Sequence, residues 1–414
     1  MEAEIITVGE EIILGEIDNT NARFLADRMR QQGIVARWQT TTDDAPQHIC
    51  TAVQNALSRV KTVFVCGGLG PTTDDNTLSA TAAALGTHLA IDERHWRWIK
   101  QEFKNRHQKM VKSNIVQACF LAGGASLTNP VGLAVGSWWQ QGEKTVVVLP
   151  GPPREFRAMV DQEVLPRLRQ LIPGQQLVAD LIMHYVGVPE SQLMTTINAA
   201  LAKNSAVVAT SYVQPGEIQV RLTTTAASQQ EADARLQTTR QTILAAQPEG
   251  YFGDGQITLA GEVVSLLKQR HLHVTAAESL TGGLVQSLIC SVPGASAVFD
   301  GGFVTYAPAQ KAAMLGIQAE VIDKYGVVSS ETAGAMADGC RQKVGADFGL
   351  GLTGVAGPDE LDGQPAGTVW LGLSIKGEPT RTRCLHLDAH SGRQAIRLNS
   401  AQLALMMLYD HLQK

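Results

Sequence analysis

The feature that most constrains the fold is a repeated succession of a short apolar strand, a glycine-rich turn and a helix. In the first 170 residues, apolar runs at 4–9, 63–66 and 145–149 are each followed by a turn and then by apolar residues at helical spacing. The run Val63–Cys66 leads into Gly67 and Gly68, and a helical pattern then ends at Gly86. Strands that alternate with helices in this way predict a parallel, doubly wound α/β sheet.

The length of the chain predicts more than one domain. It has 414 residues, and a typical domain holds roughly 150. After Pro173 the pattern changes to a strand (181–186), a helix (190–201), two strands meeting at Pro215 and a long helix (228–246), which predicts a small α+β domain. Residues 248–255 are typical of a linker. We therefore predict a first domain at 1–170, a middle domain at 175–250 and a second α/β domain at 256–414.

Composition excludes several classes of protein. Hydrophobic residues make up 44% and the net charge is −5, so the chain can bury cores and has no broad positive field for a nucleic-acid backbone. Its six cysteines are scattered singly, which is typical of reduced thiols. The first residues carry acids where a secretory signal carries bases, and no apolar run approaches the ~18 residues that span a bilayer. We expect a cytoplasmic protein without a membrane partner.

The turn from Gly67 to Thr72 is a candidate phosphate site. It contains Gly67, Gly68, Gly70, Pro71 and Thr72, and it lies between a strand and a helix, where free N–H groups and the helix dipole favour an anion. A tight connection between strand and helix explains the same residues without any ligand.

Four acidic residues near the predicted strand ends are candidate metal ligands. Asp74 and Asp75 follow the glycine turn, Glu10 follows the first strand, and Glu155 follows the turn 150–153. Because loops at the carboxyl ends of parallel strands open on one edge of the sheet, these acids predict a divalent cation bridging to a phosphoryl group. The alternative is that Asp74 and Asp75 only complement the dipole of the helix that follows.

In the last domain, Ser279 ends a predicted strand and precedes Thr281, Gly282 and Gly283. A serine in such a turn has backbone donors nearby for an oxyanion, but it needs a base. Lys311 can be that base if burial lowers its pKa, and Tyr306 lies close to it in sequence. The alternative is a helix-capping serine and a solvated lysine.

These motifs together resemble the competence/damage-inducible protein A (CinA) family. In the first domain the matching stretches are 8–15, 18–21, 67–72 with Asp74 and Asp75, 129–132 and 149–153 with Glu155. In the last domain they are 277–283, 301–306 with Lys311, 326–329, 352–358 and 365–370. The resemblance runs through the whole chain, and it implies a first domain similar to molybdopterin-binding proteins and a last domain that is an amidohydrolase.

For the first domain the resemblance implies an ADP-ribose pyrophosphatase that depends on Mg²⁺ or Co²⁺. It places the nucleotide at the residues of the glycine turn and at Asn21, Asn129, Gly132 and Gly151, and the metal at Glu10, Asp74, Asp75 and Glu155. Two departures from the family pattern are Glu10, where Asp is usual, and Leu133-Ala134-Val135, where Thr-Ala-Pro is usual. We therefore hypothesise weak or absent pyrophosphatase activity.

For the last domain the resemblance implies a nicotinamide mononucleotide (NMN) deamidase without a cofactor. Ser279, Tyr306, Lys311 and Thr353 fall on the family's catalytic positions. The substrate-binding residues that we predict are Thr281, Gly282, Gly283, Gly354, Gly357, Arg393 and Arg397. The two arginines lie four residues apart on a predicted helix and suit the phosphate, although solvated arginines in such a position are common.

Two rival functions remain open at this point. A basic segment with tryptophans at 96–112 fits DNA binding, although a solvated helix face accounts for it as well, and we expect no nucleic-acid partner. The other rival is a protein that binds a nucleotide or pterin with little or no catalysis in its first domain. Family resemblance favours a homodimer, and the partners that we expect are the small nucleotides NMN and ADP-ribose.

Overall fold

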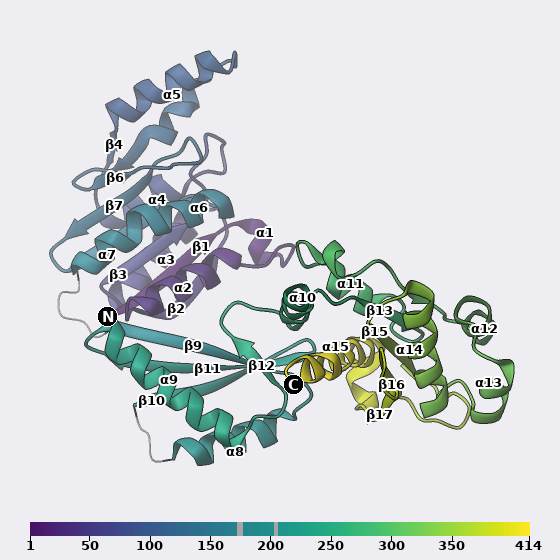
Figure 1. The fold of residues 1–414 in the computed structure, drawn as a ribbon. Coiled ribbons are helices and arrows are strands. Elements are labelled where there is room, and N and C mark those ends of the chain that lie inside the picture. Colours follow the sequence, from purple (N-terminus) through teal and green to yellow (C-terminus); the bar gives the residue numbers. More distant parts are fainter. Residues whose placement is uncertain (172–176, 203–205) are drawn as a thin grey trace. The chain divides into compact units, whose positions relative to one another are not determined.

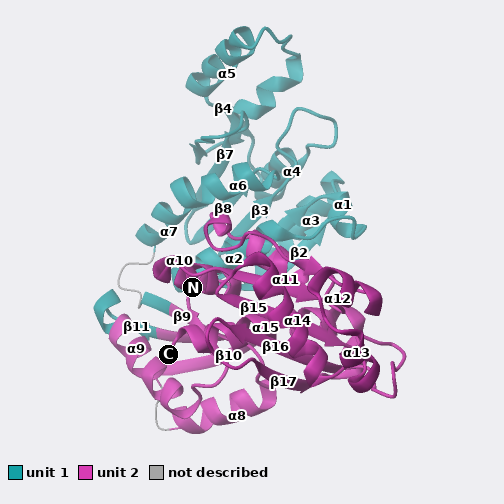
Figure 2. Cartoon of the chain, turned by 45° about the vertical axis from the view of Figure 1, so that its right-hand side comes forward, with its two compact units in different colours: residues 1–179, 225–232 teal, residues 180–224, 233–414 magenta. Residues whose placement is uncertain are grey.

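The computed structural model describes residues 1–171, 177–202 and 206–414 (Figure 1). Two compact units divide the chain: residues 1–179 with 225–232, and residues 180–224 with 233–414 (Figure 2). Among the described residues, no helix has the length and apolar character needed to cross a membrane.

The first unit is built on a six-stranded sheet in the order β2-β1-β3-β8-β7-β6. These strands are β1 (Glu2–Val8), β2 (Val35–Thr42), β3 (Thr62–Cys66), β6 (Ala125–Leu127), β7 (Gly136–Gln141) and β8 (Lys144–Leu149). The four strands from β2 to β8 are parallel, as predicted, and β7 and β6 extend this parallel sheet as antiparallel strands that the sequence did not predict. A tight turn at Gly142, with φ 59°, returns the chain from β7 directly into β8, and such a turn joins only antiparallel strands.

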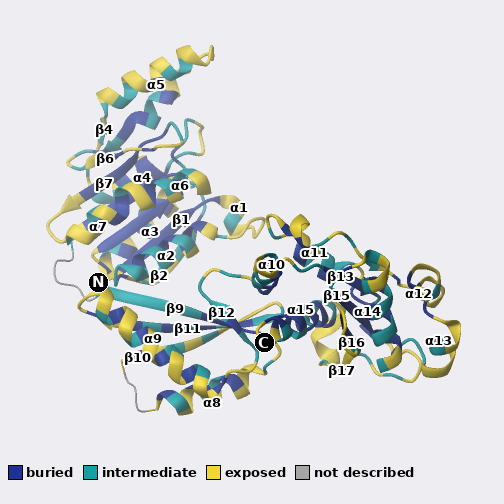
Figure 3. Cartoon of the chain, in the orientation of Figure 1, coloured by how far each residue is buried: buried dark blue, intermediate teal, exposed yellow. Residues whose placement is uncertain are grey.

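Helices cover both faces of this sheet because successive side chains of a strand point to opposite faces. Ile5, Phe64 and Val147 share one core with α2 and α6, whereas residues one position along the same strands share another core with α3 and α4. Figure 3 shows the central strands as buried. The remaining elements are α1 (Glu10–Ile13), α2 (Thr20–Gln31), α3 (Pro46–Arg59), α4 (Thr77–Leu85), β4 (Leu89–Ile91), α5 (Glu93–Asn105), a 3₁₀ helix (Lys112–Ala118), β5 (Cys119–Leu121), α6 (Pro153–Met159), a π-helical turn (Val160–Val164) and α7 (Leu165–Leu171).

The middle of the chain forms a four-stranded sheet in the order β10-β11-β9-β12. Its elements are β9 (Leu177–Tyr185), α8 (Glu190–Leu201), β10 (Val207–Gln214), β11 (Glu217–Ala226), α9 (Gln229–Ala246) and β12 (Tyr251–Asp254). The last of these strands corrects the predicted linker at 248–255, because Tyr251–Asp254 pairs antiparallel with β9. This strand lacks a clear apolar pattern in the sequence because glycines interrupt it, among them Gly253 with φ 151°.

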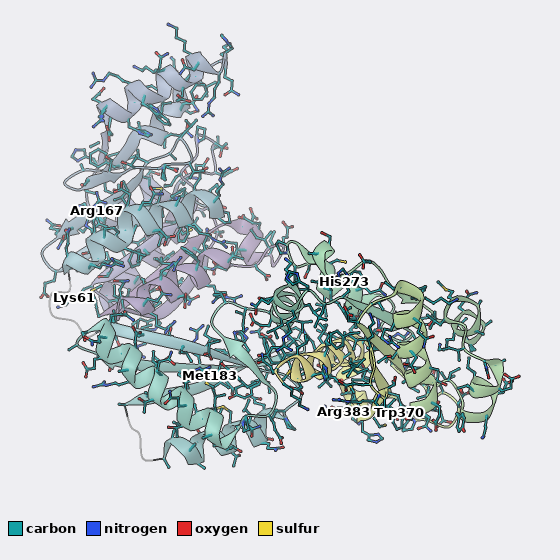
Figure 4. All side chains as sticks on the ribbon, viewed as in Figure 1. Lys61, Arg167, Met183, His273, Trp370 and Arg383 are labelled. Carbon is teal, nitrogen blue, oxygen red and sulfur yellow. The ribbon has the colours of Figure 1, made fainter. Side chains whose placement is uncertain are left out.

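The remainder of the second unit contains a five-stranded sheet in the order β14-β13-β15-β16-β17. The strands β13 (Val274–Glu278), β14 (Phe303–Val304) and β15 (Phe348–Gly354) are parallel, and β16 (Thr368–Ile375) and β17 (Arg381–His386) are antiparallel. Trp370 and Arg383 mark these two antiparallel strands in Figure 4. The helices are α10 (Leu259–Arg270), α11 (Leu284–Cys290), α12 (Pro308–Leu315), α13 (Ala319–Tyr325), α14 (Ser330–Val344) and α15 (Gly392–Leu412).

Candidate active site

Ser279 lies at the carboxyl end of β13, directly before the turn that leads into α11. Its N–H donates to the carbonyl of Leu352 (2.9 Å) on the neighbouring strand β15, and its own carbonyl accepts from the N–H of Gly282 (3.1 Å). Gly282 and Gly283 have φ values of 61° and 96°, which residues with a side chain rarely adopt. The sequence therefore makes a sharp turn here that fixes the serine backbone at the strand end.

The side chain of Lys311 reaches Ser279 from α12. The Nζ of Lys311 lies 3.1 Å from the Oγ of Ser279, 2.9 Å from the carbonyl oxygen of Thr305 and 3.4 Å from that of Tyr306. The lysine is 1% exposed, and burial lowers its pKa from 10.5 to about 8. The structure thus brings together a hydroxyl and an amine that loses its proton at mildly alkaline pH.

The side chain of Tyr306 does not take the place expected beside that pair. It is 60% exposed, and its hydroxyl accepts a hydrogen bond from Arg393 (2.9 Å). Arg393 also donates to the carbonyl of Gly357 (2.8 Å). Tyr306 therefore contacts Lys311 through its backbone carbonyl, while its ring and Arg393 lie at the pocket described next.

A pocket of 210 Å³ opens beside Ser279 in the second unit. Four of the predicted residues besides Ser279 line it, namely Tyr306, Gly354, Gly357 and Arg393, together with Leu280 and Asp359, which were not predicted. Thr281 and Thr353 are buried, and the hydroxyl of Thr353 donates to the carbonyl of Val327 (2.5 Å). In this structure Thr353 therefore holds a neighbouring loop.

Arg397 was predicted to bind the substrate, but it does not line this pocket. Its guanidinium donates to the carbonyls of Leu280 (3.0 Å) and Thr281 (2.7 Å) in the turn after Ser279. The guanidinium that was predicted to bind phosphate thus binds two backbone carbonyls instead. Tertiary packing sets the direction of this side chain, and helical spacing in the sequence does not reveal it.

Glu278 directly precedes Ser279 and was not among the predicted functional residues. Its carboxylate is completely buried and accepts from the N–H groups of Gly283 (3.0 Å), Val285 (3.2 Å) and Gln286 (3.0 Å). An acid placed a few residues before a helix is the only signal for such a cap.

A second pocket, of 420 Å³, lies in the first unit. Two of the three loops expected to share one edge of the sheet line it, the glycine turn with Gly68 and Gly70 and the 150–153 turn with Gly151. Gly132, from the loop between β6 and β7, lines it too, whereas the loop of Glu10 does not. A Cβ at Gly132 would stand 1.9 Å from the Oε2 of Glu155, so any larger residue there would displace the Glu155 carboxylate. Arg106, the residue after α5, also lines the pocket and supplies a cation there. The sequence had favoured a solvent-exposed helix face for this residue.

Other residues predicted to bind a nucleotide instead organise this pocket. The buried Asn21 donates to the carbonyl of Gly151 (2.7 Å). Asn129 accepts from the N–H of Gly132 (2.8 Å) and donates to Glu155 (2.6 Å). Gly67 packs against β1, where an added Cβ would lie 2.2 Å from the carbonyl oxygen of Val8, and Pro71 continues the same turn.

The four predicted metal ligands do not form one cluster. Asp75 accepts from the N–H (2.9 Å) and hydroxyl (2.5 Å) of Thr72, while the amide of Asn129 binds Glu155. Asp74 lies instead near Asp44, whose carboxylate accepts from the N–H of Glu10. No three His, Cys, Asp or Glu residues of the described ranges are arranged to hold a metal ion, so the predicted donor set does not fit a cation as it stands.

Comparison with known proteins decides the family. The chain is 51% identical to the competence-damage inducible protein of Limosilactobacillus reuteri strain DSM 20016, with complete coverage of both chains. It belongs to the CinA family. A second member, from Limosilactobacillus fermentum, is 49% identical, again over both complete chains.

Three family models match successive parts of the chain. The probable molybdopterin binding domain matches residues 4–170, the damage-inducible protein CinA KH domain matches 182–253, and the CinA C-terminal domain matches 256–412. A solved competence/damage inducible protein from Agrobacterium tumefaciens is 35% identical over 38% of this chain and 94% of its own, with a TM-score of 0.36.

Proposed function

We propose that the second unit of this CinA protein is an NMN deamidase that uses Ser279 as its nucleophile. The observation that carries this proposal is the buried amine of Lys311, which lies 3.1 Å from the Ser279 hydroxyl and has a pKa lowered to about 8. A serine becomes a useful nucleophile only when a neighbouring base takes its proton.

The surroundings of Lys311 favour its neutral form as that base. A neutral amine has two N–H donors and one lone pair. The carbonyls of Thr305 and Tyr306 are the acceptors for the two donors, at 2.9 and 3.4 Å. This leaves the lone pair for the third neighbour, the hydroxyl of Ser279, so the amine is oriented to receive the proton of that hydroxyl.

The reaction then proceeds by acyl transfer. Lys311 takes the Ser279 proton while the Oγ forms a bond to the carboxamide carbon of the nicotinamide ring. The resulting ammonium returns the proton to the amide nitrogen as the C–N bond breaks, and ammonia leaves. Water, deprotonated by the same amine, hydrolyses the ester and releases nicotinic acid mononucleotide.

Arg393 is the group that we assign to the phosphate of the mononucleotide. It lines the Ser279 pocket and contacts Tyr306 and Gly357 there. Guanidinium groups bind phosphates with paired hydrogen bonds, and Arg393 exchanges its two protein acceptors for phosphate oxygens when the substrate enters.

For the first unit we propose nucleotide binding with little or no hydrolysis. The glycine-lined pocket with Arg106 supports an anionic ligand. The dispersed positions of Glu10, Asp74, Asp75 and Glu155 give no support for a metal-dependent pyrophosphatase, and we derive no hydrolytic step from them.

One experiment tests both units. The purified protein is incubated separately with NMN and with ADP-ribose plus Mg²⁺ or Co²⁺, and the products are identified by mass. We expect nicotinic acid mononucleotide and ammonia from NMN, and no rapid AMP release from ADP-ribose. NMN that stays intact contradicts the deamidase, and brisk AMP release contradicts the assignment of the first unit.

A further inference from the structure

The turn from Ser279 to Gly283 leaves two backbone N–H donors free. These donors suggest a role for Arg397, and that inference rests on the proposed deamidase function. The N–H groups of Ser279 and Gly282 donate to backbone carbonyls, and that of Gly283 donates to Glu278. Within the described ranges, the N–H groups of Leu280 and Thr281 donate to no protein group.

At the start of α11 most N–H groups are already bound. The buried carboxylate of Glu278 accepts from Val285 and Gln286 as well as from Gly283, and the side-chain amide of Gln286 donates to it too (3.1 Å). An anion that belongs to the protein therefore already binds three backbone N–H groups at this helix terminus. In this turn only Leu280 and Thr281 remain to stabilise negative charge on a substrate.

The directions of these two N–H groups are fixed by Arg397 and by a hydrogen bond within the turn. In a trans peptide the C=O and N–H groups point to opposite sides. The bond from Arg397 to the Leu280 carbonyl (3.0 Å) therefore fixes the N–H of Thr281 on the other side of the same peptide. In the same way, the bond from Gly282 to the Ser279 carbonyl fixes the N–H of Leu280.

We propose that Arg397 is a positioning residue for an oxyanion hole formed by the N–H groups of Leu280 and Thr281. Leu280 lines the same pocket as Ser279, and Thr281 is the next residue of the same turn and is buried. We place both N–H groups beside the carboxamide oxygen that becomes negative during attack. Arg393 lines that pocket and binds phosphate, whereas Arg397 holds the turn through Leu280 and Thr281. The two arginines, four residues apart on α15, thus have different tasks.

The test compares steady-state kinetics of NMN and its unphosphorylated analogue, nicotinamide riboside. Arg397→Ala is expected to lower kcat about 10- to 100-fold on both substrates, with KM changed less than about threefold, because outright loss of an oxyanion donor costs about 10²–10³ in kcat. The matched variant Arg393→Ala is expected to raise KM for NMN and to leave the riboside unaffected. Guanidinium chloride well below denaturing concentrations is expected to restore part of the kcat of Arg397→Ala.

Four outcomes overturn the inference. A higher KM for NMN alone in Arg397→Ala identifies a phosphate ligand, and an unchanged kcat removes any role in the reaction. If Arg397→Ala does not fold by circular dichroism, Arg397→Lys decides: with one carbonyl contact kept, its kcat falls about tenfold on both substrates, and a wild-type kcat overturns the proposal. A wild-type protein that releases no ammonia from NMN overturns the proposed function, and this inference with it.

Discussion

At the scale of single residues, the chemistry depends on one buried amine. Lys311 is 1% exposed, and its polar neighbours are a hydroxyl and two carbonyls. Burial without a carboxylate partner penalises the charged form of the amine, so the pKa falls to about 8. The amine is then neutral often enough near pH 7.5 to act as a base, yet basic enough to take a proton from serine.

This pKa predicts the pH dependence of the reaction. Below pH 8 most Lys311 carries a proton and cannot accept another, so kcat/KM for NMN should fall about tenfold for each pH unit toward acid and level off above about 8. The measurement is initial ammonia release between pH 6 and 9.5. Lys311→Met should lack activity at every pH, and a flat profile of the wild type would refute Lys311 as the base.

At the scale of elements, a strand end, a turn and a helix start form one unit around Ser279. Glu278 closes the helix start, Arg397 holds the turn from α15, and α12 supplies Lys311. These contacts come from three segments far apart in sequence. Each of them removes freedom from the turn that carries the nucleophile, and such preorganisation is what acyl-transfer sites need.

Loss of the Glu278 charge should weaken this arrangement measurably. In Glu278→Gln an amide NH₂ replaces one acceptor oxygen and faces backbone N–H donors, so we expect a loss of about 1–3 kcal/mol in the free energy of unfolding. The matched control is Glu331→Gln, an exposed acid in the first turn of α14, for which we expect a change within about 0.5 kcal/mol. Urea unfolding measures both, and equal effects would disprove a special role for Glu278.

At the scale of the whole molecule, the two pockets belong to different compact units. Each is lined by loops at the carboxyl ends of parallel strands, where α/β sheets bind ligands. The chain thus contains two separate pockets, one in each unit.

A substitution in the first unit should leave the deamidase intact. In Gly132→Ala the new Cβ would collide with Glu155, which disturbs the glycine-lined pocket, so ADP-ribose binding measured by calorimetry should weaken at least about tenfold. The control Gly142→Ala meets no atom within 4 Å and should bind normally. Ammonia release from NMN should stay at the wild-type rate in both, and a parallel loss in Gly132→Ala would show that the two sites are coupled.

The fold was predictable wherever local signals agreed with tertiary structure. Apolar runs before glycine turns located β1, β3 and β8, and Gly86 ended α4 at φ 64° as expected. The antiparallel strand β7 and the short strand β12 were missed, since turn chemistry at Gly142 and pairing with β9 define them rather than a long apolar pattern.

The site was predictable in residue type but not in side-chain direction. Ser279 and Lys311 were paired as candidate nucleophile and base from their residue types, and the family resemblance favoured that pair over a capping serine and a solvated lysine. The structure places the two side chains in contact. Arg397 and Tyr306 have long side chains whose direction is set by the carbonyls and cations that tertiary packing brings near them. Sequence spacing therefore placed both on the correct elements but could not tell which groups they contact.

The most direct test of the central claim is the rate of ammonia release from NMN by Ser279→Ala, measured at pH 8 beside the wild type. With Lys311 and the pocket retained but no nucleophile, the account predicts a folded protein whose kcat is lower by about 10³-fold or more. A kcat within tenfold of the wild type would contradict it, because the amide would then be broken without the serine.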